Sequence, residues 1–198
     1  MRILAIDPSK KSAGWACFSL GDARPTYGHW ELASEFTSEG KLYCNMQQNI
    51  FDLHKLGAIS HIFIEDAFTV ALRAGNNNIQ WLKDISGLIA HVKSLAEAMG
   101  CRQIREVPLE TWRAHFIGGT EVKSAKQAAR LESKLRAKKV SASNALKELV
   151  IIRCEQLGLS PKVSDEADAL GILDYACDWH GITPPWRRDE ILRPPLGA

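Results

Sequence analysis

Two short apolar runs, each closed by an acidic residue, constrain the fold of this chain more than any other feature. The first runs from Ile3 to Ile6 and ends at Asp7, and the second runs from His61 to Ile64 and ends at Glu65. Short continuous apolar runs are typical of buried strands in an α/β sheet. Ligands of such sheets bind at the carboxyl ends of the strands, so we expect both acids to face a crevice there.

A late helical pattern adds two more acids. Residues three apart on a helix lie about 60° from each other around its axis, so two acids at that spacing project toward a common point, whereas Glu166 and Asp174 point elsewhere. Like charges gather only around something positive, and hard cations such as Mg²⁺ or Mn²⁺ prefer carboxylate oxygen. We predict a divalent-metal site whose catalytic and metal-binding residues are Asp7, Glu65, Asp165 and Asp168.

Each acid also has a structural explanation. An Asp before Pro8 is a common turn starter, a strand-end Glu is often an exposed edge residue, and acids in a first helical turn favour the helix dipole. The metal-site prediction therefore rests on the set of acids and on their order along the chain.

The same residues resemble the motifs of a known family. The segment Ile3 to Ser9, with Gly14-Trp15-Ala16 after it, is similar to the opening of RuvC-type Holliday-junction resolvases, especially the phage and prophage members. Ile64 to Phe68 resembles the family's second acidic strand with its following aromatic residue, and Asp165 to Leu170 resembles its closing Asp-x-x-Asp-Ala-Leu helix. Gly87 falls where the family has a glycine in the helix after the second acid. The resemblance covers residues 1 to about 180, loosely in the middle.

This resemblance implies an α/β protein with an RNase H-like fold. It further implies a hydrolase of the crossover junction endodeoxyribonuclease type, which uses two divalent ions per active site. By the same resemblance, a homodimer places two sites on a four-way DNA junction and nicks strands of like polarity symmetrically.

The length and composition agree with one compact domain. The chain has 198 residues, with 45% hydrophobic and 24% charged residues, which are ordinary globular values. No apolar stretch approaches the ~20 residues that span a bilayer, and the start lacks the pattern of a secretory signal. We expect a cytoplasmic protein of a bacterial or phage-infected cell, with no membrane partner. A nuclease domain at 1–183 and a Pro/Arg-rich tail at 184–198 are the predicted divisions.

The apolar periodicity predicts a mixed five-stranded sheet flanked by helices. Segments 14–19 and 26–31 indicate a hairpin that continues from the first strand, and 103–107 indicates a fifth strand closed by Pro108. Helical spacing of apolar residues from Leu42 to Leu53 and from Ile79 to Leu95 indicates two core-facing helices. The resulting order, β-β-β-α-β-α-β-α, is the one expected of an RNase H-like sheet with three antiparallel strands and then two parallel ones.

Basic charge is concentrated in residues 121–139, which hold seven positive and two negative side chains although the whole chain has a net charge of only +2. Four of the cations recur at helical spacing and can form one stripe that contacts DNA phosphates; the alternative is a solvated helix face. Because this segment is usually shorter in the phage-like members of the family, residues 120–143 are predicted to be a basic helical insertion. The predicted stripe consists of Lys123, Lys126, Arg130 and Lys134.

The loop after Glu65 carries the other predicted DNA contacts, Phe68, Arg73 and Asn76. In the family an aromatic residue at the place of Phe68 wedges beside a base at the branch point, and base stacking is worth about 1–3 kcal/mol. The alternatives are a core phenylalanine and ordinary loop composition.

Several nearby residues receive plainer interpretations. Lys10 and Lys11 are predicted to be exposed hairpin lysines, and Trp112 and Arg113 a packed tryptophan beside a solvent-facing arginine. The proline-rich tail from Pro184 onward is predicted to be an extended arm. Scattered cysteines and histidines, without Cys-x-x-Cys spacing, give no support for zinc or a Cys-His nucleophile.

The leading hypothesis is hydrolysis of a DNA phosphodiester by a water activated at one ion, while a second ion stabilises the departing oxygen. Asp7 bridges both ions in this scheme, Glu65 and Asp168 complete opposite sides, and Asp165 binds a metal or orients its water. Alternatives are an RNase H-like nuclease for flaps, forks or packaged phage DNA, and a non-catalytic junction-binding module. An actin-like ATPase would need a second Asp-Gly phosphate loop, and Glu65-Asp66-Ala67 stands instead. No nucleotide cofactor is expected.

Overall fold

The five strands form one mixed sheet. The computed structural model of the chain describes residues 1–66, 79–135 and 141–192. The strand order is β3-β2-β1-β4-β5; β1, β2 and β3 pair antiparallel, whereas β1, β4 and β5 run parallel. The predicted three antiparallel and two parallel strands are confirmed. The strands are β1 (Arg2–Asp7), β2 (Ser12–Ser19), β3 (Thr26–Glu31), β4 (His61–Asp66) and β5 (Gln103–Pro108).

Turn chemistry closes the β2–β3 hairpin. Gly21 has a φ of 107°, in the left-handed region that glycine adopts without steric cost. The carboxylate of Asp22 accepts a hydrogen bond from the Ser19 N–H at 3.0 Å, which holds the end of β2 against the turn.

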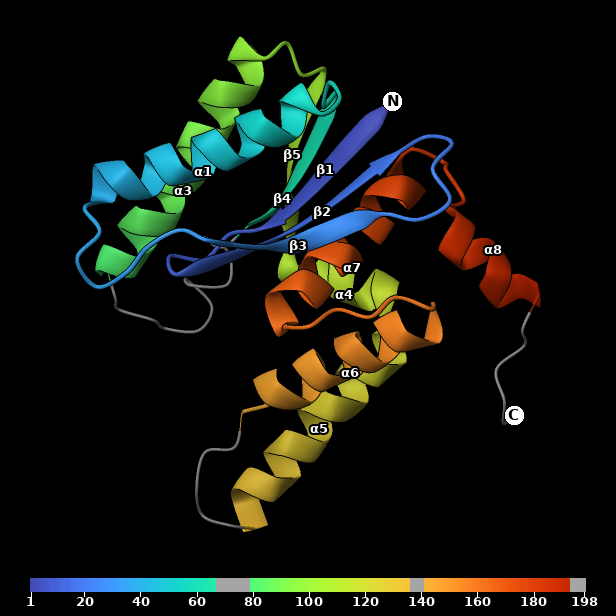
Figure 1. The fold of residues 1–198 in the computed structure, drawn as a ribbon. Coiled ribbons are helices and arrows are strands. Elements are labelled where there is room, and N and C mark those ends of the chain that lie inside the picture. Colours follow the sequence, from blue (N-terminus) through green and yellow to red (C-terminus); the bar gives the residue numbers. More distant parts are fainter. Residues whose placement is uncertain (67–78, 136–140, 193–198) are drawn as a thin grey trace.

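Helices α1 (Glu39–Lys55) and α3 (Ile79–Ala98) cover one face of the sheet (Figure 1). The hydroxyl of Ser38 accepts from the Lys41 N–H at 3.3 Å and caps the start of α1. A Cβ on Gly87 would overlap the hydroxyl of Tyr43, so this glycine allows α3 to lie close against α1. The buried side chains of this layer include Leu42, Met46, Ile50, Ile85, Leu88 and Val92.

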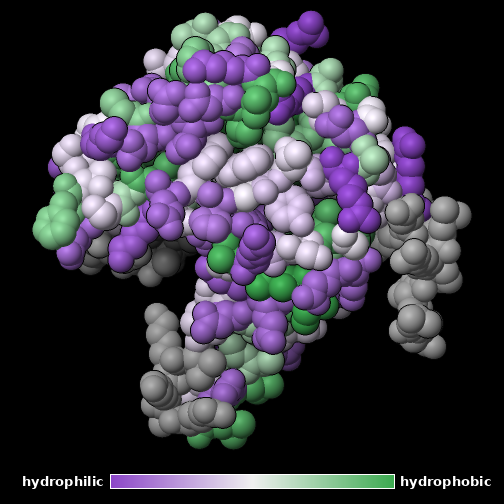
Figure 2. Space-filling view, in the orientation of Figure 1, coloured by the Kyte–Doolittle hydropathy of each residue, from purple (hydrophilic) through white to green (hydrophobic). Residues whose placement is uncertain are grey.

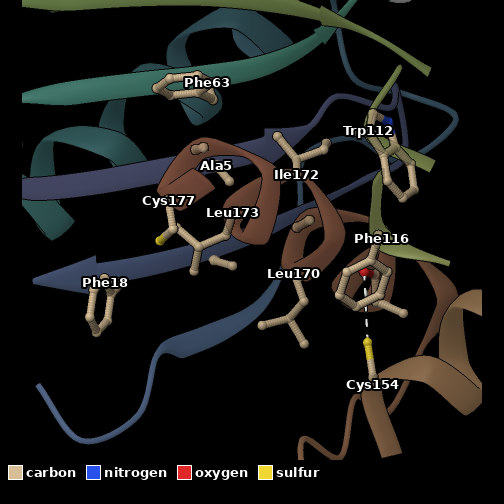
Figure 3. Packing of buried hydrophobic residues seen from close by; sticks show 14 of the residues in the cluster. Ala5, Phe18, Phe63, Trp112, Phe116, Cys154, Leu170, Ile172, Leu173 and Cys177 are labelled. Carbon is tan, nitrogen blue, oxygen red and sulfur yellow. Dashed lines mark hydrogen bonds between the residues drawn. The ribbon is translucent and has the colours of Figure 1, made fainter. Parts of the chain in front are cut away.

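Helix α7 (Ser164–Trp179) lies against the other face and forms the second core. Every residue from Glu166 to Asp174 is buried, because the sheet covers one side of the helix and α4 (Leu109–Phe116), α6 (Ser143–Gln156) and α8 (Pro185–Leu192) cover the rest. Figure 3 shows Trp112 and Phe116 beside α7, and Ala5, Phe18 and Phe63 on the sheet.

Helices α5 (Gly119–Leu135) and α6 project from the body as a two-helix arm (Figures 1 and 2). The helix predicted within the basic segment is therefore confirmed for α5. That residues 120–143 are an insertion, and that the nuclease domain ends at residue 183, stay predictions.

The predicted extended arm after Pro184 is wrong for residues 185–192, which form α8. Pro185 is the first residue of this helix, where the missing N–H of proline costs nothing. Trp186 is buried and its ring meets the ring of Phe18 edge to face, with centroids 5.1 Å apart. The start of the tail is therefore part of the packed body. No helix in the described ranges is long and apolar enough to cross a bilayer.

Candidate metal centre

Strands β1 and β4 bring Asp7 and Glu65 to one edge of the sheet. The parallel register pairs Ile6 with Ile64, so each acid follows at the same level of its strand. Side chains alternate between the faces of a sheet, and Ala5 and Phe63 pack into the core on the α7 side. Asp7 and Glu65, two positions further along, therefore also face α7.

The start of α7 lies over this edge because β2 carries a glycine there. Gly14 pairs with Asp7 in the antiparallel register. A Cβ on Gly14 would overlap the backbone carbonyl of Asp165, so no larger residue permits the observed contact. Gly14 thus seats the first turn of α7, which carries Asp165 and Asp168, next to Asp7.

Electrostatics show that the four predicted acids share one environment. Loss of hydration raises the pKa of Asp7 well above its ordinary value, and the negative charges of Glu65, Asp168 and Asp165 raise it further. Burial, followed by the charge of Asp168, raises the pKa of Glu65 to about 7. Burial also raises the pKa of Asp168, against the lowering effect of Arg113. The structure therefore brings together all four acids that the sequence singled out.

The donor chemistry of this cluster fits a hard divalent cation. Its side chains offer carboxylate oxygens, and Asp168 Oδ1 is buried without a hydrogen-bond partner among the described residues. Several carboxylates close together in a desolvated site, one with an unpartnered oxygen, favour binding of a cation. Within residues 1–66, 79–135 and 141–192, however, no three His, Cys, Asp or Glu side chains are arranged to hold one ion. The cluster therefore fits a cation by its negative charge and its oxygen donors, and not by a preformed coordination geometry among the described residues.

Helix α4 contributes two neighbours of the acids that were not predicted. Trp112 donates its indole N–H to Glu65 Oε2 at 3.0 Å, and Arg113 donates through Nη2 to Asp168 Oδ2 at 3.0 Å. The prediction of a solvent-facing Arg113 is wrong, because only 6% of this residue is exposed. The packed Trp112 is confirmed, and a Cβ on Gly171 of α7 would lie 2.6 Å from its ring. Trp112 and Arg113 thus each donate a hydrogen bond to one carboxylate oxygen, on Glu65 and on Asp168 respectively.

A chain of hydrogen bonds joins α6 to Asp165. Lys147 Nζ donates to Ser164 Oγ at 3.2 Å, and Ser164 Oγ donates to Asp165 Oδ1 at 3.1 Å. The positive charge of Lys147 also lowers the pKa of Asp168. Lys147 could not be identified from the sequence, because its helix is separated from α7 in the chain and only packing brings them together.

The other acids of α7 point elsewhere, as predicted. Glu166 contacts His29 of β3, at 2.8 Å between Oε1 and Nδ1. Burial alone would raise the pKa of Asp174, but hydrogen bonds from His115, Arg187 and Trp186 lower it to about 2. Asp174 is therefore a structural acid that fastens α4 and α8 to α7.

Lys10, which was predicted to be an exposed hairpin lysine, is partly exposed but also forms an ion pair. Its side chain is 47% exposed, but Nζ lies 2.8 Å from Oδ2 of the buried Asp84 on α3. It therefore ties the turn after Asp7 to the opposite helix layer and is more than a solvated hairpin lysine.

The predicted DNA contacts lie in two places. Lys123, Arg130 and Lys134 are exposed on α5, whereas Lys126 is half-buried and pairs with Glu110 of α4 at 3.0 Å. Phe68, Arg73 and Asn76 lie outside the described residues.

The mixed five-stranded sheet with helices on both faces has the RNase H-like α/β fold, and the four acids lie at the ends of β1 and β4 and at the start of α7. Comparison with solved structures agrees. The chain is similar to Thermus thermophilus RuvC, with a TM-score of 0.60, 16% identity, and coverage of 93% of this chain and 99% of that chain. The same protein in complex with a Holliday junction substrate gives a TM-score of 0.58, 16% identity, and coverage of 91% and 96%.

The yeast mitochondrial Holliday junction resolvase Ydc2 is also similar, with a TM-score of 0.51, 14% identity, and coverage of 96% of this chain and 80% of that one. No protein-family model matches the chain, and a search of curated proteins finds no significant match. At these identities the likeness establishes the fold, which is that of the RuvC-type structures.

Proposed function

We propose that this protein is a divalent-metal-dependent endonuclease that resolves four-way DNA junctions. The observation that carries the proposal is the meeting of Asp7, Glu65, Asp165 and Asp168 at one edge of an RNase H-like sheet. Asp7, Glu65 and Asp168 are desolvated, and the negative charges of the cluster repel one another although Arg113 pairs with Asp168. Such a cluster costs stability unless a further cation compensates it. A functional site explains that cost, whereas a turn starter, an edge residue and a helix-dipole pair do not.

The proposed ligands are the four carboxylates, with two Mg²⁺ or Mn²⁺ ions as the preferred occupants. The chemistry that such ions supply when bound is polarisation of a phosphodiester and activation of water. The chain's own contribution is orientation: Trp112 holds Oε2 of Glu65, Arg113 holds Oδ2 of Asp168, and Ser164 holds Oδ1 of Asp165. Such outer partners fix the direction of ligand oxygens.

The choice of a junction as substrate is supported by the fold neighbours. One of the similar structures is a RuvC bound to a Holliday junction substrate, and another is described as a Holliday junction resolvase. The phage and prophage-like branch, suggested by the opening motif, is part of the proposal. So are a homodimer, which would place two sites on one junction, and a cytoplasmic location.

The proposed DNA contacts use the exposed cations of α5. Lys123 and Arg130 stand on the arm that projects from the body (Figure 2), where they can approach phosphates away from the acids. Phe68, Arg73 and Asn76 are proposed to contact the branch point.

A substrate panel tests the proposal. Labelled four-way junction, fork, flap and linear duplex of matched sequence are incubated with the protein in Mg²⁺, Mn²⁺ or EDTA. Paired nicks in the junction that need metal, with much slower cutting of the other substrates, are expected. Equal cutting of all four would make the protein a less selective nuclease, and tight junction binding without nicks would make it a binding module.

A further inference from the structure

Three residues lie in one row across the antiparallel strands, directly under the start of α7. Asp7 of β1 pairs with Gly14 of β2, and Gly14 pairs with His29 of β3. Paired residues in a sheet present their side chains on the same face, and this row faces α7. Asp7 is a proposed ligand and Gly14 receives the carbonyl of Asp165, so His29 is the member of the row that remains to be explained.

His29 contacts helix α7 through Glu166. Its Nδ1 lies 2.8 Å from Glu166 Oε1, and because a carboxylate only accepts, Nδ1 is the donor. Glu166 Oε2 accepts from the Lys162 N–H at 2.7 Å, so both oxygens of Glu166 are engaged. Glu166 is only 4% exposed, which makes each of these bonds expensive to lose.

We infer that His29 is a positioning residue for the metal centre, acting through Glu166. Glu166 sits between Asp165 and Asp168 on the first turns of a rigid helix, so the direction of its side chain fixes the rotation of α7 about its axis. That rotation decides where both acids point relative to Asp7. This inference rests on the proposed function only in taking the four acids as metal ligands.

The geometry distinguishes this role from ordinary stabilisation. Tyr27, two residues before His29 on the same face of the same strand, also contacts the chain ahead of α7: its hydroxyl accepts from the Ser160 N–H at 3.1 Å. That bond holds the segment before the helix, whereas the His29 bond holds the helix itself between two ligands. Tyr27→Phe is therefore a matched control that removes one hydrogen bond from the same strand edge.

The test is the binding of Mn²⁺ alone to the full chain, monitored through the EPR signal of free Mn²⁺. His29→Ala is expected to raise the Mn²⁺ dissociation constant about tenfold, the usual effect of removing an outer partner of a ligand. His29→Asn, whose amide can donate near the position of Nδ1, is expected to restore most of the affinity. Tyr27→Phe is expected to leave it unchanged. His29→Phe, which keeps a ring but has no nitrogen to donate, is measured in case His29→Ala fails to fold by circular dichroism, and is expected to weaken Mn²⁺ binding as well.

Affinity in His29→Ala or His29→Phe equal to that of the wild type would overturn the inference, as would an equal loss in Tyr27→Phe. Nicking provides a second readout: His29→Ala should lower kcat at fixed Mg²⁺ and recover with more Mg²⁺, while KM for DNA stays constant. If the wild type binds Mn²⁺ but does not nick junctions, the proposed function is wrong. The role of His29 is then decided by the Mn²⁺ affinities of the variants. A wild type that binds no Mn²⁺ would overturn both.

Discussion

The indole N–H of Trp112 lies 3.0 Å from Oε2 of Glu65, which links the short helix α4 to the acid at the end of β4. This hydrogen bond occupies one oxygen of Glu65 and lowers the pKa of a carboxyl that burial raises. The bond stabilises the ionised form that a metal requires, so Trp112 has a role in the site beyond packing.

Trp112→Phe should weaken Mn²⁺ binding about tenfold or more, because Glu65 loses a buried donor and its orientation. Calorimetric titration with Mn²⁺ measures the effect. Trp186→Phe is the matched control: it removes another buried indole bond, from Trp186 of α8 to Asp174 of α7 at 2.8 Å, and Asp174 is not one of the four proposed ligands. The control should lower the free energy of unfolding by about 1–3 kcal/mol and leave metal affinity intact. If Trp112→Phe binds Mn²⁺ as tightly as Trp186→Phe and the wild type do, Trp112 contributes packing alone.

Gly14→Ala should displace the start of α7, because the added Cβ meets the backbone carbonyl of Asp165 and backbone cannot move aside as a side chain can. We expect a loss of about 1–3 kcal/mol in unfolding free energy and a larger proportional loss of nicking. Gly40→Ala on α1 is the control, since a Cβ there meets nothing within 4 Å. It should be neutral or slightly stabilising. Full nicking by Gly14→Ala would contradict the seating of α7 on β2.

Glu65→Gln should change the pH dependence of stability in metal-free buffer. The pKa of Glu65 in the folded protein, about 7, lies above its ordinary value of 4.5, so the fold holds this proton more tightly than the unfolded chain does. The stability from this proton is fully present below pH 4.5 and is lost as the pH rises through 7. The wild type should therefore lose up to about 3 kcal/mol relative to the variant between pH 5 and pH 8. Urea unfolding at a series of pH values measures this difference, and parallel curves would contradict it.

Lys123→Ala and Arg130→Ala should each weaken junction binding and reduce the salt dependence. Removing one cation from a DNA phosphate lowers the slope of log K against log salt by about 0.9. Lys126→Ala should have less effect, because Lys126 pairs with Glu110. Lys41→Ala, on helix α1 across the sheet, serves as the control. Fluorescence anisotropy at several salt concentrations gives the slopes, and unchanged slopes would remove α5 from the proposed DNA surface.

The strands and the four acids could be predicted because their signals are local. The apolar run before Asp7 and the three-residue spacing of Asp165 and Asp168 depend only on neighbours in the chain. Two further arguments then predicted that the acids lie together: ligands of such sheets bind at the carboxyl ends of the strands, and the motifs resemble those of a known family. Gly14 was visible only as part of a motif, since its contact with Asp165 crosses more than a hundred residues of sequence.

The roles of Trp112 and Arg113 could not be predicted, because an eight-residue helix has too few turns to show which face is buried. Arg113 is buried only because α7 brings Asp168 against it. Prolines misled the prediction of the tail: Pro185 starts a helix, and Trp186 finds its partners Phe18 and Asp174 on distant elements. Such partners are decided by packing, which no local pattern records.

The most direct measurement is nicking of a labelled four-way junction in Mg²⁺ by the wild type, Asp7→Asn and Asp168→Asn, each first shown to fold and to bind the junction. We predict paired, metal-dependent nicks by the wild type and none by either variant while junction binding persists. Undiminished nicking by both variants, or none by the wild type in Mg²⁺ and in Mn²⁺, would contradict a metal-dependent resolvase built on these acids.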